Sequence, residues 1–246
     1  MDWLTAAGWG VFSGSALLLG AAAAFFLSIP PRLVALVMAF GSGILISALS
    51  FELMEEAIGT GGFWPTAAGF LGGAALYTAA NVILARRGAK HRKRSGDQQP
   101  SDSNSGVAIV LGALLDGVPE SVVIGVSLIG GGAVSLPAVT AIFLSNVPEG
   151  LSGTAGMKTV GRSPLYIFGL WGGITVFSGL AAIAGYLLVG DLGGGAVAAA
   201  NAIAAGAILC MIADTMIPEA FSESHDFAGL VTVVGFLAGF SLSHVL

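Results

Sequence analysis

Long apolar runs make up most of the chain, and short groups of proline, glycine or charged residues separate them. The pattern predicts helices at about residues 8–28, 33–57, 63–85, 106–130, 134–158, 165–189, 193–219 and 226–246. Each run is close to the roughly 20 apolar residues that a helix needs to cross a bilayer. We therefore expect an all-α polytopic membrane protein, with eight transmembrane helices in a single domain over residues 1–246.

The composition indicates the same fold class. Hydrophobic residues make up 55% of the chain and charged residues only 9%, with a mean hydropathy of +0.91. Soluble domains carry about 25% charged residues. The 38 glycines lie among Leu, Ile, Val and Phe, which suits close packing of membrane helices. The first apolar run has no basic start and no clear cleavage site, so we expect a retained helix instead of a signal peptide.

The basic residues predict the orientation. All nine Lys and Arg residues fall in the connections after the first, third and fifth apolar runs, which places them on one side of the membrane. By the positive-inside rule this side is the cytoplasm, so both termini are expected on the other side. We expect a multi-pass protein of the cell (plasma) membrane, a polar cytoplasmic loop at about 86–105, and no nucleic-acid partner.

Two apolar runs contain the same short motif. LLDGVPES ends at Ser121 and FLSNVPEG ends at Gly150, and an offset of 29 residues aligns their Pro-Glu steps. A second, weaker repeat aligns residues 40–57 with 203–220, so the second and seventh helices are expected to be related elements that flank the fourth and fifth. Such repeats are common in transporters, whose sites lie near the bilayer midplane.

The ionisable side chains within the apolar runs are all acidic. Glu52, Asp116, Glu120, Glu149 and Asp214 lie there, whereas no Lys or Arg does apart from Lys158, the last residue of the fifth run. A carboxylate at membrane depth costs several kcal/mol unless it is paired, protonated or in contact with water. Because the interiors of the runs hold no basic side chain, the compensating charge is expected to be a proton or a bound cation.

Helical spacing sorts the polar side chains into two faces, one on each helix with a Pro-Glu step. Asp116 and Glu120 are four residues apart, and Ser145, Asn146 and Glu149 are related by three and four. If these two helices pack together, up to five oxygen-bearing side chains converge. The candidate metal ligands are therefore Asp116, Glu120, Ser145, Asn146 and Glu149.

The prolines of the two motifs strengthen this hypothesis. A proline within a helix cannot donate to the carbonyl four residues earlier, so Pro119 and Pro148 leave two carbonyl oxygens available near the middle of the membrane. Such carbonyls often line ion sites. Glu52, Asp214 and Glu219 are second candidates for an ion pathway, with ordinary polar packing as the alternative for Glu52 and Asp214.

Other interpretations of these residues stay open. A buried glutamate that is permanently protonated has a structural role only, and Ser and Asn often merely join helices. The alternative function is a transport-inactive membrane scaffold or metal sensor. An intramembrane enzyme would need a nucleophile with a base or an aspartate pair. No flanking pattern supports pairing Asp116 with Asp214, so we expect no enzyme.

With these motifs the chain resembles the ZIP (ZRT/IRT-like) metal transporter family over essentially its whole length. The similarity includes the Pro-Glu steps at Glu120 and Glu149, GILISALSFELMEEA at 43–57 and GAILCMIADTMIPEAF at 206–221. The resemblance implies eight helices in a 3+2+3 bundle, with a metal site between the fourth and fifth. It also implies that the substrate is a divalent transition metal, usually Zn²⁺, that enters the cytoplasm.

The chain also departs from the family pattern. Asp116 stands where the fourth helix usually has histidine, and Ala182 and Ile183 replace a Glu-Pro step in the sixth. We therefore expect one metal position instead of a binuclear pair. Because only oxygen ligands remain, the site also suits harder ions. We take Zn²⁺ as the leading substrate, Mn²⁺ and Fe²⁺ as alternatives, and a homodimer as compatible with the glycine-rich helix faces.

Overall fold

The computed structural model describes residues 2–89, 105–129, 133–190, 192, 194–224 and 226–245. This part of the chain is 92% helical and contains no strand, which confirms the all-α class. Six of its helices or unbroken helical runs are long and apolar enough to cross a membrane. They are Asp2–Phe26, Pro31–Gly61, Phe63–Arg87, Pro164–Val189, Gly194–Ser224 and Ala228–Val245. These helices are consistent with a multi-pass membrane protein.

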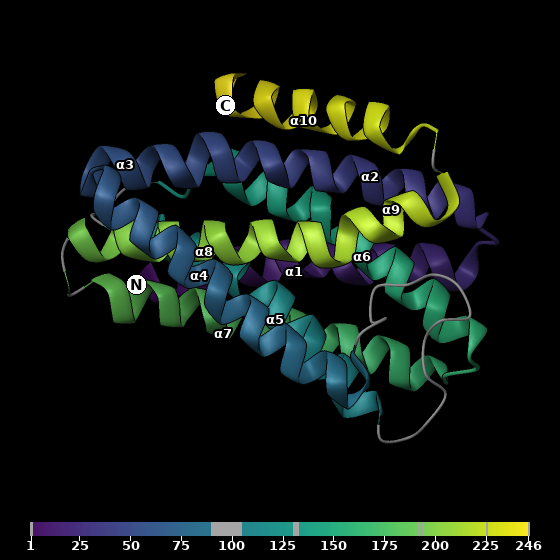
Figure 1. Ribbon diagram of the computed structural model, residues 1–246. Coiled ribbons are helices and arrows are strands. Elements are labelled where there is room, and N and C mark those ends of the chain that lie inside the picture. Colours follow the sequence, from purple (N-terminus) through teal and green to yellow (C-terminus); the bar gives the residue numbers. More distant parts are fainter. Residues whose placement is uncertain are drawn as a thin grey trace.

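Ten α-helices and three short π-helical turns, labelled η, make up the described chain (Figure 1). In chain order they are α1 (Asp2–Phe26), α2 (Pro31–Ala48), η1 (Leu49–Met54), α3 (Glu55–Gly61), α4 (Phe63–Leu84), η2 (Ala85–Ala89), α5 (Ser105–Val126), α6 (Leu136–Thr159), α7 (Pro164–Gly190), α8 (Gly194–Met211), η3 (Ile212–Met216), α9 (Ile217–Ser224) and α10 (Ala228–Val245). The elements α2, η1 and α3 form one unbroken helical run, and α8, η3 and α9 form another.

Proline, glycine and serine set several helix boundaries. Pro31 lies in the first turn of α2, where its missing N–H removes no helical hydrogen bond. Gly62 and Gly161 have φ angles of 74° and 76°, which only glycine adopts at little cost. The Ser135 side chain accepts a hydrogen bond from the Ala138 amide and thereby caps the start of α6.

The observed helices overlap the predicted apolar runs, with differences at the ends. The first helix begins at Asp2 instead of near residue 8. A polar loop was expected at about 86–105. Its start instead belongs to η2, which covers Ala85–Ala89, and residues 90–104 lie outside the described residues. α5 and α6 are not among the six helices long and apolar enough to span, so whether they also cross the membrane belongs to the proposal below.

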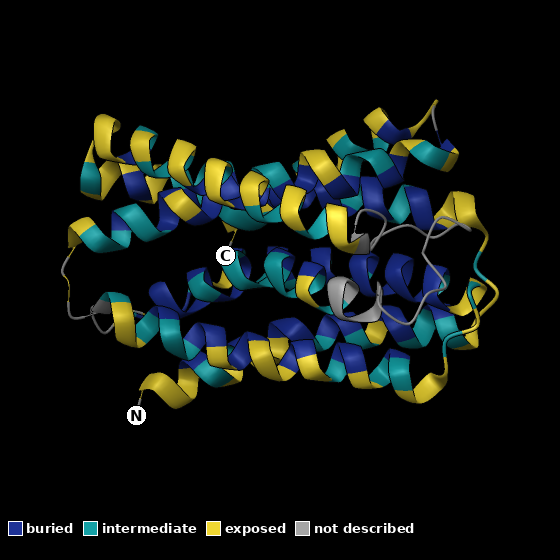
Figure 2. Ribbon diagram, turned by 60° about the horizontal axis from the view of Figure 1, so that its bottom comes forward, coloured by how far each residue is buried: buried dark blue, intermediate teal, exposed yellow. Residues whose placement is uncertain are grey.

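The helices pack in two groups. In the first group α6 and α7 lie against α1, and α5 lies against α7. In the second group α10 lies against α2 and α4 against α8. The groups meet where α2 packs on α6 and α8 packs on α5. Figure 1 shows α10 alongside α2, and Figure 2 shows the buried residues concentrated along the centre of the bundle. The candidate residues on α5 and α6 therefore lie at the junction of the two groups.

Matched glycines show that the second sequence repeat is also a structural repeat. A Cβ atom at Gly43 of α2 would lie 2.9 Å from the carbonyl carbon of Thr232 in α10, and one at Gly206 of α8 would lie 2.9 Å from that of Phe70 in α4. Gly43 and Gly206 are the glycines that the repeat aligns. Because Gly61 at the end of α3 lies against Ala198 near the start of α8, the two helical runs are antiparallel. The repeat is therefore inverted, as in many transporters.

The π-helical turns η1 and η3 occupy the same position in this repeat. The offset of 163 residues that aligns Gly43 with Gly206 also aligns the first residue of η1, Leu49, with the first residue of η3, Ile212. Glu52 lies on η1 and Asp214 on η3. The sequence analysis did not predict these turns, which are often found at functional sites.

Candidate functional site

Asp116 and Glu120 are buried on α5, with exposed fractions of 1% and 2%. The Tyr77 hydroxyl, on α4, donates a hydrogen bond to Asp116 Oδ1. Behind them, a Cβ atom at Gly125 would lie 2.8 Å from the carbonyl carbon of Ala182 in α7. Glycine at this position thus lets α5 lie close to α7, and the helix holds both carboxylates away from lipid.

Ser145, Asn146 and Glu149 are buried on α6. The Asn146 amide nitrogen donates to the carbonyl oxygen of Ser13 in α1 at 3.1 Å, and the Ser145 hydroxyl donates to Ile142 O at 2.9 Å. Neither bond uses the Asn146 amide oxygen, which is the atom that would bind a cation. The α6 side chains are thus held mainly by α1 and by their own helix.

A pocket of about 290 Å³, the acidic pocket, lies where η1 passes into α3 and where α5 ends and α6 begins. Glu52, Glu55 and Glu56 line it together with Val123, Ser127, Ser135 and Ala138. Ser135 Oγ donates to Glu52 Oε2 at 3.0 Å, and Asn201 Nδ2 donates to Glu56 Oε2 at 2.8 Å. Glu52, a second candidate from the sequence, is therefore part of a negatively charged pocket at one end of the bundle.

The buried carboxylates lie at successive depths below this pocket. Val123 of α5 and Ala138 of α6 both line the acidic pocket and so mark a common level. At about 1.5 Å per residue, Glu120 lies about 5 Å and Asp116 about 10 Å from that level along α5, and Glu149 lies about 16 Å from it along α6. Successive carboxylates form a row that leads inward from the acidic pocket.

Asp116, Glu120 and Glu149 do not form a three-carboxylate metal site among the described residues. Among the described residues, no three Asp, Glu, His or Cys side chains come close enough together to hold one metal ion. The reason is the packing of the two helices, because α5 lies mainly on α7 and α8, whereas α6 lies mainly on α1 and α2. The ligand roles of these residues stay a prediction.

The two Pro-Glu motifs lie on helices that run in opposite directions, because the end of α5 and the start of α6 line the same acidic pocket. Glu120 is three residues before Val123 in α5, and Glu149 is eleven residues after Ala138 in α6. The two carboxylates therefore lie at depths about two helical turns apart.

Glu219 extends the row of carboxylates toward the other end of the bundle. It is 1% exposed, and its Oε1 accepts a hydrogen bond from the Ser152 hydroxyl of α6 at 3.1 Å. Ser152 is about one helical turn beyond Glu149. Asp214, in contrast, is exposed and accepts a hydrogen bond from Asn81 Nδ2 at 3.1 Å. The structure thus places Glu219 within the buried row and Asp214 outside it.

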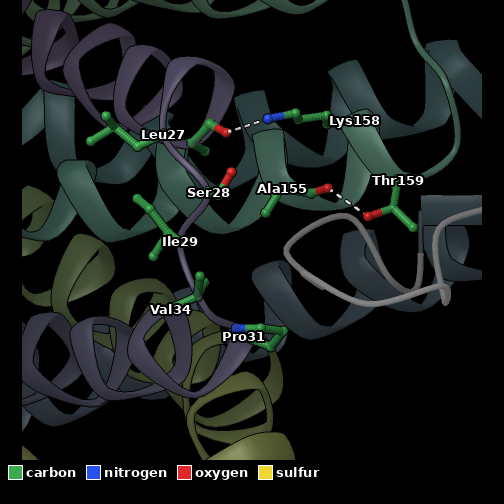
Figure 3. A pocket seen from close by; sticks show the side chains of 9 residues that line it. Leu27, Ser28, Ile29, Pro31, Val34, Ala155, Lys158 and Thr159 are labelled. Atoms are coloured by element: carbon green, nitrogen blue, oxygen red, sulfur yellow. Dashed lines mark hydrogen bonds between the residues drawn. The ribbon is translucent and has the colours of Figure 1, made fainter.

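A second pocket, of about 240 Å³, lies at the opposite end, which we call the basic end because Arg32, Lys158 and Arg162 lie there. Figure 3 shows that Lys158 in its wall points to the end of α1, where Nζ donates to Ala24 O at 3.3 Å. It also donates to Phe25 O at 2.9 Å. A fixed positive charge disfavours a metal ion in this pocket, so it is not part of the candidate site.

Sequence reasoning missed the side chains that contact the carboxylates from other helices. Tyr77, Ser152, Asn201 and Asn81 donate to Asp116, Glu219, Glu56 and Asp214, respectively. One signal could have found three of them, because a Tyr or Asn inside an apolar run needs a hydrogen-bond partner. Ser152 gave no such signal, since a serine in a helix commonly bonds to its own backbone.

A row of buried carboxylates with neutral hydroxyl and amide neighbours can bind protons or cations one after another. No known family model matches the chain, and no curated protein matches it.

Proposed function

We propose that the protein is a membrane transporter of divalent metal cations that resembles the ZIP family. The observation that carries the proposal is the row of buried carboxylates between the acidic pocket and Glu219, in a chain whose Lys and Arg residues are all at positions 32, 86–94, 158 and 162. Carboxylates at membrane depth are expensive even when they accept hydrogen bonds, and they usually mark ion pathways. A scaffold gains nothing from them.

In the proposed path, the cation enters at the acidic pocket and leaves near Glu219. It passes Glu120 and Asp116 on α5, then Glu149 on α6. Two or three carboxylates nearly balance one divalent charge, so the ion is held without being trapped. Protons replace the cation during the return step, because the carboxylates cannot stay bare at this depth.

The staggered depths suggest that the ligands bind the cation in turn or come together only in another conformation. α5 and α6 belong to contact networks that meet at one junction, and Pro119 and Pro148 interrupt the hydrogen bonding of these two helices. A shift of about one helical turn, roughly 5 Å, would bring Asp116 and Glu149 to the same level. Ser145 and Asn146 would then complete the ligand set.

The oxygen donors available set the expected selectivity. Carboxylate, amide and hydroxyl groups accept Zn²⁺ but suit Mn²⁺ and Fe²⁺ as well. We retain Zn²⁺ as the leading substrate on the resemblance to the family. The proposal includes α5 and α6 as spanning helices, which makes eight in a 3+2+3 order, with the basic end at the cytoplasm of the plasma membrane and a homodimer as the assembly.

Uptake into proteoliposomes tests this function. The purified full-length protein is reconstituted, and entry of Zn²⁺, Mn²⁺, Fe²⁺ and Mg²⁺ is followed separately against protein-free vesicles. We expect saturable uptake of Zn²⁺ and weaker or no uptake of Mg²⁺. Absence of uptake for all four ions, together with no metal bound to the purified protein, would instead favour the transport-inactive scaffold.

A further inference from the structure

An apolar groove runs along the surface between α4 and α5. It consists of two adjoining hollows of about 440 and 360 Å³ that share Ala80, Leu115 and Val118 in their walls. The remaining lining is also apolar apart from the ring edge of Tyr77. Its length, from Gly73 to Leu84 on α4, is about 16 Å at the rise of an α-helix, or about half of the 30 Å hydrocarbon core.

The groove exists because α4 and α5 each pack on a different neighbour. α4 lies on α8, where a Cβ atom at Gly73 would be 2.7 Å from the carbonyl carbon of Ile203, whereas α5 lies on α7. Leu76, Ile83 and Leu111 remain 67%, 54% and 45% exposed beside it. Water would be unfavourable in such a groove at membrane depth, and hydrocarbon would not.

One end of the groove carries positive charge. Ile83 and Leu84 line the groove, and Arg86 and Arg87 follow them within one turn, on η2. Both arginines are exposed. Their position at the end of a membrane-length helix is that of a lipid headgroup, and each basic residue near the surface attracts anionic lipid.

We propose that this groove binds an anionic phospholipid, with an acyl chain between α4 and α5 and its headgroup at Arg86 and Arg87. The charge at the groove end favours this occupant over a second copy of the chain, whose α4 would bring the same two arginines and repel. The floor of the groove includes Tyr77 and Pro119. A bound acyl chain therefore packs against the tyrosine that donates to Asp116.

Native mass spectrometry of the full-length protein tests the proposal without depending on transport. The protein is titrated in detergent with phosphatidylglycerol or phosphatidylcholine of identical acyl chains. The variants are Arg86→Gln/Arg87→Gln, which removes the charge, and Ala80→Phe, which fills the groove. Arg162→Gln is the matched control, because Arg162 is also at the basic end but lies over Tyr166, away from the groove.

We expect the wild type to prefer phosphatidylglycerol. The double arginine variant should bind phosphatidylglycerol about 10- to 30-fold more weakly, at about 1 kcal/mol for each charge. Its binding of phosphatidylcholine should be unchanged. Ala80→Phe should weaken both lipids, and Arg162→Gln neither. Unchanged phosphatidylglycerol binding in the double arginine variant would overturn the proposal. The proposal would also be overturned if Ala80→Phe converted a dimer to a monomer and bound lipid as the wild type does. The groove would then be occupied by a second copy of the chain. If Ala80→Phe does not fold, the exposed arginine pair decides alone.

Discussion

Replacing Gly150 by alanine tests how α6 is positioned beside the candidate site. Gly150 follows Glu149 directly and lies where α6 crosses α1. A Cβ atom there would be 2.8 Å from the carbonyl carbon of Leu17 and 2.9 Å from its Cα, whereas ordinary contact begins at 3.4 Å. These neighbours are backbone atoms, so they cannot rotate away. The two helices must therefore separate by at least about 0.6 Å.

Overpacking of this kind costs about 1–3 kcal/mol. For a chain of this size that corresponds to a thermal midpoint about 2–12 °C lower. The separation also stretches the 3.1 Å hydrogen bond from Asn146 to Ser13. Thermal unfolding in detergent, followed by the fraction that stays monodisperse on size exclusion after heating, measures the effect.

Gly117→Ala is the matched control, because it lies within the other Pro-Glu motif and a Cβ atom there meets nothing within 4 Å. Alanine is favoured over glycine in a helix by up to about 1 kcal/mol, so this variant should be as stable as the wild type or more stable. A Gly150→Ala protein that unfolds at or above the wild-type temperature would refute the close packing of α6 on α1.

Three further predictions follow from single contacts. Tyr77→Phe removes a donor to the buried Asp116 carboxylate and should cost about 1.5–3 kcal/mol. In an Asp116→Leu background, which has no acceptor, the same change should cost much less, and equal costs would contradict the contact. Ser152→Ala removes the hydrogen bond to Glu219 and should lower the free energy of unfolding by about 1–3 kcal/mol, as measured by thermal unfolding. Ser15→Ala is the control, because the exposed Ser15 hydroxyl bonds only to its own helix. Lys158→Met removes the cation at the end of α1 and should cost about 0.3–1 kcal/mol, an effect that should diminish in high salt.

The helices and the buried carboxylates could be predicted from local sequence because each depends on residues close together in the chain. The chain can turn between two helices only where an apolar run is interrupted, as at Pro31, Gly62 and Gly161. These prolines and glycines can be recognised in the sequence alone. Likewise, an acidic residue in an apolar run without Lys or Arg is visible without a structure. The repeat of residues 40–57 at 203–220 correctly identified related helices, which the structure shows to be antiparallel.

The relative depth of the candidate ligands could not be predicted in this way. It depends on which residues of α5 and α6 lie at the acidic pocket, and no pattern within either helix contains that information. The alignment of the Pro-Glu steps suggested one level for Glu120 and Glu149, and the packing places them about two turns apart. The partners of the carboxylates were missed for the same reason, since Tyr77 and Asp116 are 39 residues apart in the chain.

The most direct test of the central claim is Zn²⁺ uptake into proteoliposomes by Glu149→Gln, with Glu223→Gln as the control. Both substitutions remove one negative charge with little change of shape, but Glu149 is 5% exposed in the buried row and Glu223 is exposed near the end of α9. We expect that Glu149→Gln abolishes uptake, whereas Glu223→Gln retains the wild-type rate. Undiminished uptake by a folded Glu149→Gln protein would contradict a cation pathway along these carboxylates.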